Sequence, residues 1–356
     1  MNLDDRQHLE AIDQSGMLAH VDGLPEQLEK AFQHGLRLPL SDTLNNVQQV
    51  LICGMGGSAI GGDFLGALMQ AKGRLPVFVC RTYDLPAWAN NEKTLVIASS
   101  FSGYTEEVIA AYEIAVQRGL PVVALTTGGA LAALVEGKPD QTLWKFDHQS
   151  PPRAALGWSV GLLLAVAHRL NWMPDIERDV RTAVAVMQKY RAIYGFEVPT
   201  ERNPAKRQAG QFMGRFPVSY GGGAFEIVAR RWKTQFNENS KIWAMYEAIP
   251  EADHNGVVGI EFPERQIAHT VAMFIRSREF DHPRVALRHD LTSQIFLQAG
   301  VNIDHFWAEG DTLLAQVMHA TLYGDYMSLY AAIAHDADPT VIWPIDQLKE
   351  QLSSHN

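Results

Sequence analysis

Residues 95–107 read Leu-Val-Ile-Ala-Ser-Ser-Phe-Ser-Gly-Tyr-Thr-Glu-Glu, an apolar run that breaks into a series of hydroxyl-bearing residues. The apolar part, from residue 94 to 98, predicts a buried parallel strand, and the pattern from residue 106 onward predicts a helix. Hydroxyl groups thus gather at the carboxyl end of a strand, beside a helix start whose amide groups and dipole favour an anion. The stretch therefore predicts a site for a phosphate group that needs no metal ion.

A second junction of this kind lies at residues 54–63, which read Gly-Met-Gly-Gly-Ser-Ala-Ile-Gly-Gly-Asp and follow an apolar run at 47–53. Ligands of open α/β sheets bind at the carboxyl ends of neighbouring strands, so we expect the two junctions to line one crevice. Because no Walker lysine follows the glycines, a single phosphate group, as on a sugar phosphate, fits better than a nucleoside triphosphate.

Two other interpretations of the glycine-rich turn stay open. A dinucleotide-binding loop would make the chain an NAD-dependent dehydrogenase, although Arg81-Thr82-Tyr83 stands where an acidic ribose ligand is expected. Alternatively, the glycines serve only a tight turn and close helix packing.

Apolar runs alternate with helical patterns through the first half of the chain. The predicted strands lie at 47–53, 76–80, 94–98, 121–125 and 142–146, and the predicted helices at 58–71, 105–118 and 129–136. Strands that are apolar on both faces and alternate with helices indicate a parallel sheet covered on both sides. One or two amphipathic helices are expected before them, within residues 4–36.

The second half repeats this order after two connecting helices. These helices are predicted at 154–170 and 176–195, and the later elements are a helix at 203–215, a strand from 216 into Gly221-Gly222-Gly223, a helix at 224–235, strands at 268–275 and 301–306, and helices at 284–298 and 311–334. We predict an α/β protein of two doubly wound, flavodoxin-like domains with parallel sheets. The predicted ranges are 1–153 with leading helices, 154–200 for the connection, and 201–356 with a terminal helix.

Composition excludes several classes of protein. The formal charge of -10 and a pI near 5.7 argue against a nucleic-acid partner. We expect the short basic patch of Arg230, Arg231 and Lys233 to be a solvated helix face. The longest apolar stretch, 154–167, is too short to cross a bilayer and predicts a buried helix, so no membrane partner is expected.

Cysteine usage indicates a reducing compartment. The sequence has two cysteines, Cys53 and Cys80, both in or beside apolar strand patterns, where a thiol acts as a small hydrophobic group. We expect no disulfide, no metal site and no cofactor. The acidic start, Met-Asn-Leu-Asp-Asp, lacks the order of a secretory signal, which predicts a cytoplasmic protein.

The two junctions resemble the signature segments of the sugar isomerase (SIS) domain. With four further motifs, the whole chain from about residue 45 is similar to the bifunctional phosphoglucose/phosphomannose isomerases. Those motifs are Pro152-Arg153-Ala154-Ala155-Leu156-Gly157, Asn237-Glu238-Asn239-Ser240-Lys241, His254-Asn255 and Pro344-Ile345-Asp346-Gln347-Leu348-Lys349.

The resemblance implies the enzymatic role of each matching position. It implies a metal-independent aldose–ketose isomerase of hexose 6-phosphates, with a place in glycolysis or gluconeogenesis, and a homodimer in which His254 comes from the neighbouring subunit. The implied phosphate-binding residues are Gly57, Ser58, Ser100, Ser102 and Thr105. The implied catalytic residues are Glu238 as the base, Arg153 near C1 and C2, and His254 and Lys349 in ring opening.

These residue types suit the reaction. A carboxylate can take a proton from C2 and return it to C1 through a cis-enediol, provided that water is kept away. A fixed guanidinium stabilises the developing enediolate more than the neutral substrate. Histidine titrates near neutral pH and can therefore move a proton between O1 and O5, and a lysine can polarise the ring oxygen.

By position alone, each catalytic candidate also has a plainer interpretation. Glu238 fits an exposed helix-end carboxylate with Glu247 and Glu251 as rivals, His254 fits a turn, and Lys349 fits a solvated terminal helix. A non-catalytic SIS regulator would keep the hydroxyl cluster and need no base.

Two positions depart from the family pattern. The family associates a threonine seven residues before the terminal lysine with acceptance of mannose 6-phosphate. Here that offset gives Ile342, with Thr340 close by, so the choice between glucose and mannose stays open. Tyr104 stands where many SIS proteins have asparagine.

Overall fold

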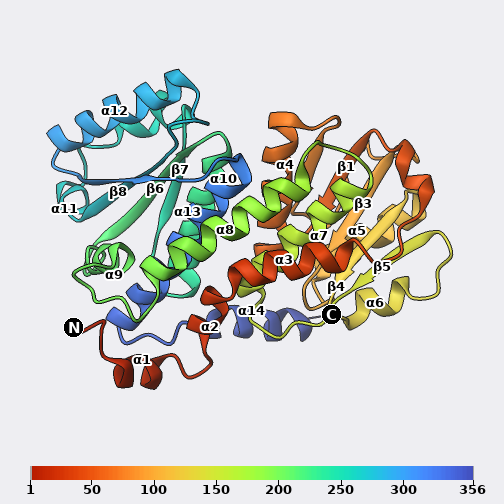
Figure 1. Ribbon diagram of the computed structural model, residues 1–356, viewed down its shortest axis with the longest axis horizontal. Coiled ribbons are helices and arrows are strands. Elements are labelled where there is room, and N and C mark those ends of the chain that lie inside the picture. Colours follow the sequence, from red (N-terminus) through yellow and green to blue (C-terminus); the bar gives the residue numbers. More distant parts are fainter. Residues whose placement is uncertain (1, 356) are drawn as a thin grey trace. The chain divides into compact units, whose positions relative to one another are not determined.

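The computed structural model describes residues 2–355 and divides into two compact units (Figure 1). The first unit comprises residues 23–188 and 309–319, and the second comprises residues 1–22, 189–308 and 320–356. Helices α8 (Ile176–Tyr194) and α13 (Leu313–Ala334) contain residues of both units. Each unit is described by itself.

The first unit carries a five-stranded parallel sheet. Its strands are β1 (Gln49–Cys53), β2 (Val77–Cys80), β3 (Thr94–Ser99), β4 (Val122–Thr126) and β5 (Gln141–Lys145), in the order β2-β1-β3-β4-β5. Its further helices are α3 (Leu24–Gly35), η1 (Asp42–Asn46), α4 (Gly56–Lys72), α5 (Glu106–Gln117), α6 (Gly129–Val135), η2 (Pro152–Ala154) and α7 (Leu156–Arg169). This strand order is the flavodoxin-like one.

Alternate residues of each strand face the helices on opposite sides of this sheet. Gly62 of α4 packs against Ile52 and Val79, so α4 covers that face. On the other face, Cys53 and Cys80 belong to a buried apolar cluster that includes Val108 of α5. Period-two side-chain alternation explains the division, because neighbours in a parallel register share a face.

The second unit carries a four-stranded parallel sheet in the order β7-β6-β8-β9. Its strands are β6 (Phe216–Gly222), β7 (Met245–Ile249), β8 (Thr270–Arg276) and β9 (Asn302–Trp307). Its helices are α1 (Arg6–Ile12), α2 (Met17–Asp22), α9 (Pro204–Gly210), α10 (Ala224–Glu238), η3 (Glu251–His254), η4 (Gly256–Val258), α11 (Glu264–Ala268), α12 (Pro283–Gln298) and α14 (Trp343–Ser353).

The predicted fold class, two doubly wound parallel sheets, is confirmed. Predicted elements of the first half match the observed ones within about two residues, and the apolar stretch 154–167 lies in a buried helix, α7. Three differences stand out: residues 4–36 form three helices, the helix predicted at 203–215 ends at Gly210, and β7 was missed. Strand β7 reads Met-Tyr-Glu-Ala-Ile and is only partly buried, so its sequence lacks an apolar run.

The basic patch on α10 is not a uniformly solvated face, which corrects the expectation for Arg231. Arg231 is 1% exposed. Its guanidinium makes a bidentate ion pair with Asp325 of α13, with Nη2 2.8 Å from Oδ2 and Nε 3.2 Å from Oδ1. Gln235 donates to the same carboxylate. A buried guanidinium needs such a partner, since an unpaired charge would be costly in the interior.

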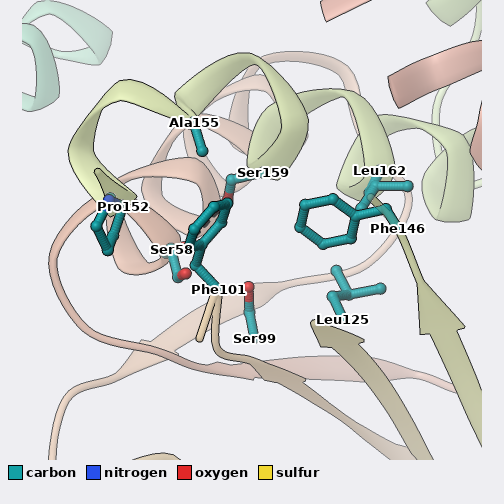
Figure 2. Close-up of a pocket in the computed structure, with 10 residues that line it drawn as sticks. Ser58, Ser99, Phe101, Leu125, Phe146, Pro152, Ala155, Ser159 and Leu162 are labelled. Carbon is teal, nitrogen blue, oxygen red and sulfur yellow. Dashed lines mark hydrogen bonds between the residues drawn. The ribbon is translucent and has the colours of Figure 1, made fainter. Parts of the chain in front are cut away.

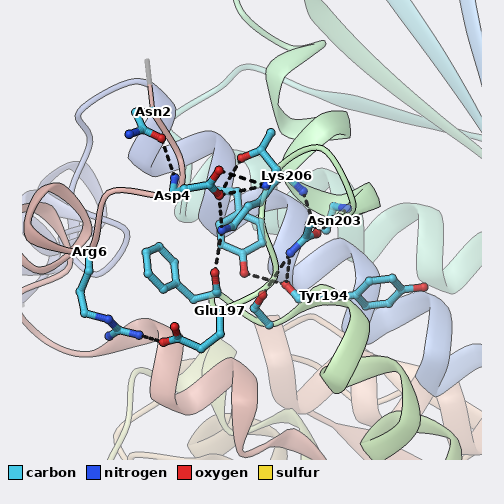
Figure 3. A network of polar contacts seen from close by, with 12 residues as sticks. Asn2, Asp4, Arg6, Tyr194, Glu197, Asn203 and Lys206 are labelled. Atoms are coloured by element: carbon cyan, nitrogen blue, oxygen red, sulfur yellow. Dashed lines mark hydrogen bonds and ion pairs between the residues drawn. The ribbon is translucent and has the colours of Figure 1, made fainter.

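Lys206 of α9 is a second buried cation, and its ammonium group is paired by hydrogen bonds (Figure 3). Its ammonium group donates to the carboxylate of Asp4 at 2.8 Å and to the carbonyl of Phe196 at 2.7 Å, and it lies over the ring of Tyr330. Burial alone would raise the pKa of Asp4, but hydrogen bonds from Lys206 and Thr200 hold it below its usual value. The contact fastens the segment before α1 to the second unit.

Two findings concern the membrane and the thiols. In residues 2–355, none of the helices combines the length and apolar character that a membrane span requires. Cys53 and Cys80 are both buried free thiols.

Candidate functional site

The two hydroxyl- and glycine-rich junctions follow neighbouring strands. Strands β1 and β3 pair in parallel, and Cys53, the last residue of β1, pairs with Ala98 near the end of β3. The helix after β1 leads to β2 on one side, and the helix after β3 leads to β4 on the other. The strand order therefore reverses between them, and such a switch point opens a crevice where ligands bind. The predicted adjacency of the two strand ends is confirmed.

The first junction leaves room beside its backbone. Gly56 has φ of +50°, and a Cβ added there would meet nothing within 4 Å. Ser58 is the third residue of α4 and is half-buried. The first amide groups of a helix have no acceptor within the helix, so this open turn offers donors to an anion.

The second junction is ordered by its own hydroxyls. Ser100 Oγ lies 2.8 Å from Thr105 Oγ1 and accepts the amide of Gly103 at 3.1 Å, and Ser102 Oγ accepts the amide of Tyr104 at 3.2 Å. Ser100 is 1% exposed, whereas Ser102 is exposed and Thr105 half-buried. The buried Ser100 thus stabilises the loop by hydrogen bonds, whereas Ser102 and Thr105 present hydroxyls at its surface.

A neighbouring loop braces this junction, which the sequence analysis missed. Thr127 donates to the carbonyl of Phe101 through its amide at 3.0 Å and its hydroxyl at 2.7 Å, and the amide of Leu131 donates to the carbonyl of Gly103 at 2.9 Å. A Cβ at Gly103 would lie 1.9 Å from the carbonyl oxygen of Gly128. The run Thr126-Thr127-Gly128-Gly129 directly after a strand was the signal that could have found this loop.

A small pocket lies behind the two junctions (Figure 2). Ser58 and Ser99 line it together with Ser159 of α7, whose hydroxyl lies 3.5 Å from the carbonyl of Ser58. Phe101 and Phe146 form its apolar wall, with ring centroids 6.1 Å apart. Residues of the first turn of α4, of the end of β3 and of α7 therefore line the same small pocket.

Arg153 lies next to the first junction. A Cβ at Gly57 would approach the carbonyl oxygen of Pro152 at 3.0 Å and the Cα of Arg153 at 3.5 Å, so η2 is packed against the first turn of α4. The side chain of Arg153 is buried at 3% exposure. The backbone of Arg153 therefore lies beside the first turn of α4, in the same unit as the predicted phosphate-binding residues.

In the similar glycine turn of the second unit, two of the three glycines are closely packed. A Cβ at Gly221 would lie 2.1 Å from the carbonyl oxygen of Phe225, and one at Gly222 would lie 2.5 Å from the side chain of Val285. Gly221 and Gly222 serve close packing of α10 and α12, but Gly223, which directly precedes α10, has φ of +54°, and an added Cβ there would meet nothing within 4 Å, as at Gly56. The two turns are therefore alike in backbone geometry, and the hydroxyl groups at the two junctions are what distinguish the first unit.

Glu238 is the last residue of α10, in a turn that its neighbours fasten. Asn237 donates to the carbonyl of Ile242 at 2.8 Å, and Ser240 donates to the carbonyl of Ser328 at 2.6 Å. Lys241 donates to the carbonyls of Glu238 and Asp338 at 2.7 and 2.6 Å. Glu238 itself is half-buried, so the motif holds a carboxylate at a fixed and accessible turn.

His254 is exposed and ends η3, directly after a residue clamped to α12. The Asp253 carboxylate accepts from Arg288 at 2.9 Å and from Thr292 at 2.8 Å. Sequence reasoning missed this clamp, since Asp253 lies 35 and 39 positions from its two partners on α12. It fixes the backbone that presents His254.

The second unit does not bring Glu238 and His254 together. Helix α10 starts after the carboxyl end of β6 and packs back along it, so Glu238 lies toward the edge where β6 begins. His254 follows Ile249, which pairs with Gly222 at the carboxyl end of β6. The seven residues of β6 span about 20 Å between those edges.

The remaining candidates lie in or near the second unit's sheet and terminal helix. Lys349 is exposed on α14, and Ile342 is the residue that precedes this helix. Of the rival carboxylates, Glu251 is exposed, while Glu247 lies in β7 and burial raises its pKa. Within residues 2–355, no group of three or more His, Cys, Asp or Glu side chains is arranged to hold a metal ion.

Family models match both halves of the chain. Residues 43–133 match the SIS domain, and residues 201–352 match the bacterial phospho-glucose isomerase C-terminal SIS domain. A bifunctional phosphoglucose/phosphomannose isomerase of Caldicellulosiruptor bescii is 37% identical over 95% of this chain and 99% of its own length. A protein of the same name from Thermoplasma acidophilum is 29% identical over 94% of this chain and 99% of its length.

Solved structures show the same fold. A glucose-6-phosphate isomerase like protein from Thermus thermophilus aligns with a TM-score of 0.65 at 19% identity, covering 96% of this chain and 98% of that one. The close relative spans nearly the full length of both chains, and the two family models follow each other in the expected order. The chain belongs to the bifunctional phosphoglucose/phosphomannose isomerase family.

Proposed function

We propose that this chain interconverts glucose 6-phosphate and fructose 6-phosphate through a cis-enediol, without a metal ion. One observation carries the proposal: two helix starts with exposed or half-buried hydroxyls flank the switch point of the first sheet, and the backbone of Arg153 is packed beside the first of them. The relatives in this family bear the name of that activity. The reaction would place the protein in cytoplasmic sugar metabolism, in glycolysis or gluconeogenesis.

The 6-phosphate is bound by the first unit in this proposal. Ser58, Ser102 and Thr105 contact the phosphate oxygens with their hydroxyls, and the amides of Gly57 and its neighbours donate from the first turn of α4. Ser100, buried beneath Thr105, keeps the second loop in place. Binding energy from this remote group orients C1 and C2 for the proton transfer.

Glu238 acts as the base that carries a proton between C2 and C1. A single carboxylate can serve both carbons because they are adjacent, and the proton stays on the enzyme if water is excluded. Arg153 stabilises the negative charge that develops on the enediolate oxygen. His254 and Lys349 move and supply the proton when the pyranose ring opens.

A homodimer supplies His254 to the partner's site in this mechanism. The two residues lie at opposite edges of one sheet in the same chain, so a His254 that acts with Glu238 comes from a second copy. The segment after His254 carries Val258 and Phe262, each 76% exposed, which a second copy would cover. Burial of such side chains drives association.

The experiment that tests the function is a direct assay. Purified protein in EDTA should convert fructose 6-phosphate to glucose 6-phosphate, and a parallel assay with mannose 6-phosphate measures the effect of Ile342. A non-catalytic SIS regulator would bind these sugars and leave them unchanged, and a dehydrogenase would bind NAD. Binding of fructose 6-phosphate with no turnover in the dimer would refute the isomerase proposal.

Removing single hydroxyls from the phosphate site should weaken substrate binding more than it slows the chemical step. Ser102→Ala and Thr105→Val are each expected to raise KM roughly tenfold, about the worth of one hydrogen bond to a charged group, with a smaller change in kcat. Steady-state kinetics with fructose 6-phosphate measure both constants. Ser41→Ala, which removes an exposed hydroxyl before η1, is the control and should leave KM unchanged. An unaltered KM in both site variants would mean that the phosphate group binds elsewhere.

Mixing two inactive variants should restore activity if His254 crosses between subunits. A dimer of Glu238→Gln with His254→Ala rebuilds one intact site from the glutamate of one subunit and the histidine of the other. After unfolding and refolding together, an equal mixture should regain about one quarter of the wild-type rate, because half of the dimers are mixed and each has one good site. Each variant refolded alone is the control. A mixture no more active than these controls would exclude His254 of the partner subunit from the site that contains Glu238.

A further inference from the structure

The two cysteines are direct neighbours across the first sheet. Cys53 ends β1, Cys80 ends β2, and the two residues pair in the parallel register. Cys53 is 1% exposed and Cys80 is 9% exposed, and both are free thiols. A tertiary pairing thus joins two side chains that lie 27 positions apart and that the sequence presents as separate small hydrophobic groups.

The geometry allows a bond between the two sulfurs. Paired residues of neighbouring strands lie about 4.8 Å apart, within the Cα separation of about 4.4 to 6.8 Å that a disulfide spans. Both side chains point to the α5 face, since they belong to one buried cluster there. The two side chains therefore face each other across neighbouring strands, and their Cβ atoms need only approach each other for the sulfurs to bond.

Cys80 is the thiol that an oxidant reaches first. It lies on β2, the edge strand of the sheet, and is more exposed than Cys53. Its sulfur lies 3.3 Å from the hydroxyl of Thr82 and 3.3 Å from the carbonyl oxygen of Asp84. A hydrogen bond from Cys53 lowers the pKa of Cys80 to about 5, and Thr82 and Arg81 act in the same direction. A thiolate is the form of cysteine that attacks peroxides.

We propose that Cys53 and Cys80 form a dithiol that a peroxide oxidises to a disulfide. This disulfide loosens the phosphate-binding turn. The Cys80 sulfur attacks the O–O bond of hydrogen peroxide, becomes a sulfenic acid and releases one water. The Cys53 sulfur then attacks that sulfur, the S–S bond forms, the S–O bond breaks, and the hydroxide leaves with the Cys53 proton as a second water. Two thiols and one peroxide thus give one disulfide and two waters.

The disulfide acts on the phosphate site through Gly54. This residue directly follows Cys53, and its amide donates to the carbonyl of Cys80 at 3.2 Å. A Cβ at Gly54 would lie 3.2 Å from both the amide of Ala59 and the carbonyl of Ser99, so the turn is tightly packed against both junctions. A disulfide draws the two Cβ atoms to about 3.8 Å, closer than strands normally hold them. The resulting displacement of Cys53 and Gly54 displaces Ser58 at the start of α4 as well.

The coupling to the sugar phosphate rests on the proposed function, but the thiol chemistry does not. Oxidation of the purified chain with hydrogen peroxide, followed by intact mass and peptide mapping, should show the loss of two hydrogens and a peptide that links Cys53 to Cys80. Dithiothreitol should reverse the change. The variant Cys80→Ala should be resistant to this oxidation and keep the wild-type rate before and after peroxide.

Ligand binding is measured on the same samples by calorimetry with fructose 6-phosphate and with inorganic phosphate. The oxidised wild-type chain should bind fructose 6-phosphate roughly tenfold more weakly than the reduced chain, since displacements near 1 Å are costly at a positioned site. Saturating fructose 6-phosphate should in turn shift the equilibrium between dithiol and disulfide toward the dithiol, because coupling between two equilibria is reciprocal.

Three outcomes would overturn the inference. The first is a Cys80 that gains oxygen atoms while Cys53 stays a thiol, and the second is a disulfide between molecules instead of within one. The third is an internal disulfide that leaves the affinity for fructose 6-phosphate unchanged. An enzyme that binds the sugar but never isomerises it would refute the proposed function and leave these readouts intact, so the two failures are distinguishable.

Discussion

Replacing Glu238 with glutamine should lower kcat for fructose 6-phosphate by about 10²- to 10⁴-fold, the usual worth of a positioned general base. Glutamine keeps the size and polarity of the side chain but cannot accept the proton from C2. The turn that carries it is fastened by Asn237, Ser240 and Lys241, so its backbone should stay in place. Affinity for fructose 6-phosphate, measured by calorimetry, should change little, because the proposed phosphate-binding residues belong to the first unit.

Two matched substitutions make this result specific. Glu264→Gln, at an exposed position of α11, removes a carboxylate from the same unit and should leave kcat unchanged. Glu247→Gln tests the rival base, whose partly buried position in β7 raises its pKa. If the Glu238 variant kept a near-normal rate while the Glu247 variant lost it, the base would have to be reassigned to Glu247.

Gly103→Ala should be the most damaging single methyl group that can be added near the phosphate site. A Cβ there would lie 1.9 Å from the carbonyl oxygen of Gly128, and the residue has φ of +73°. The collision involves backbone, so the two braced loops must separate. We expect a loss of about 3 kcal/mol in the free energy of unfolding, from overpacking added to left-handed backbone strain. KM should also rise, because the same loop carries Ser102 and Thr105.

Gly119→Ala is the matched control for this substitution. Gly119 has φ of +67°, nearly the same backbone conformation, but an added Cβ meets nothing within 4 Å. It should cost only about 1 to 2 kcal/mol of backbone strain and leave KM unaltered. Urea unfolding followed by circular dichroism compares the two variants. Equal losses in both would mean that the contact between Gly103 and Gly128 does not constrain the loop.

Local patterns were enough to predict most elements and the position of the two junctions at strand ends. The run at 94–98 became β3, and the serines and threonine after it became the loop before α5, because strand and helix formation depend on residues a few positions apart. Strand β7 escaped this reasoning because its Met-Tyr-Glu-Ala-Ile sequence is neither continuously apolar nor strictly alternating. Its partners β6 and the helix α10 stabilise it from outside the segment.

The environment of single polar side chains was beyond those patterns. Arg231 and Lys206 look like ordinary surface cations along the chain, yet each is buried against a carboxylate far away in sequence, Asp325 and Asp4 respectively. The clamp of Asp253 on Arg288 and Thr292 is of the same kind. Such contacts depend on which segments meet, and the sequence near each residue does not encode that.

The sequence by itself determined where strands end, where helices begin, and therefore that hydroxyls and amide donors gather at two junctions. That the two junctions lie side by side was expected from the sequence and is confirmed, but only the tertiary structure decided that β1 lies between β2 and β3, which sets Cys53 beside Cys80. The reason is that parallel pairing joins segments tens of residues apart, and a shift of one residue in register would turn each side chain to the opposite face.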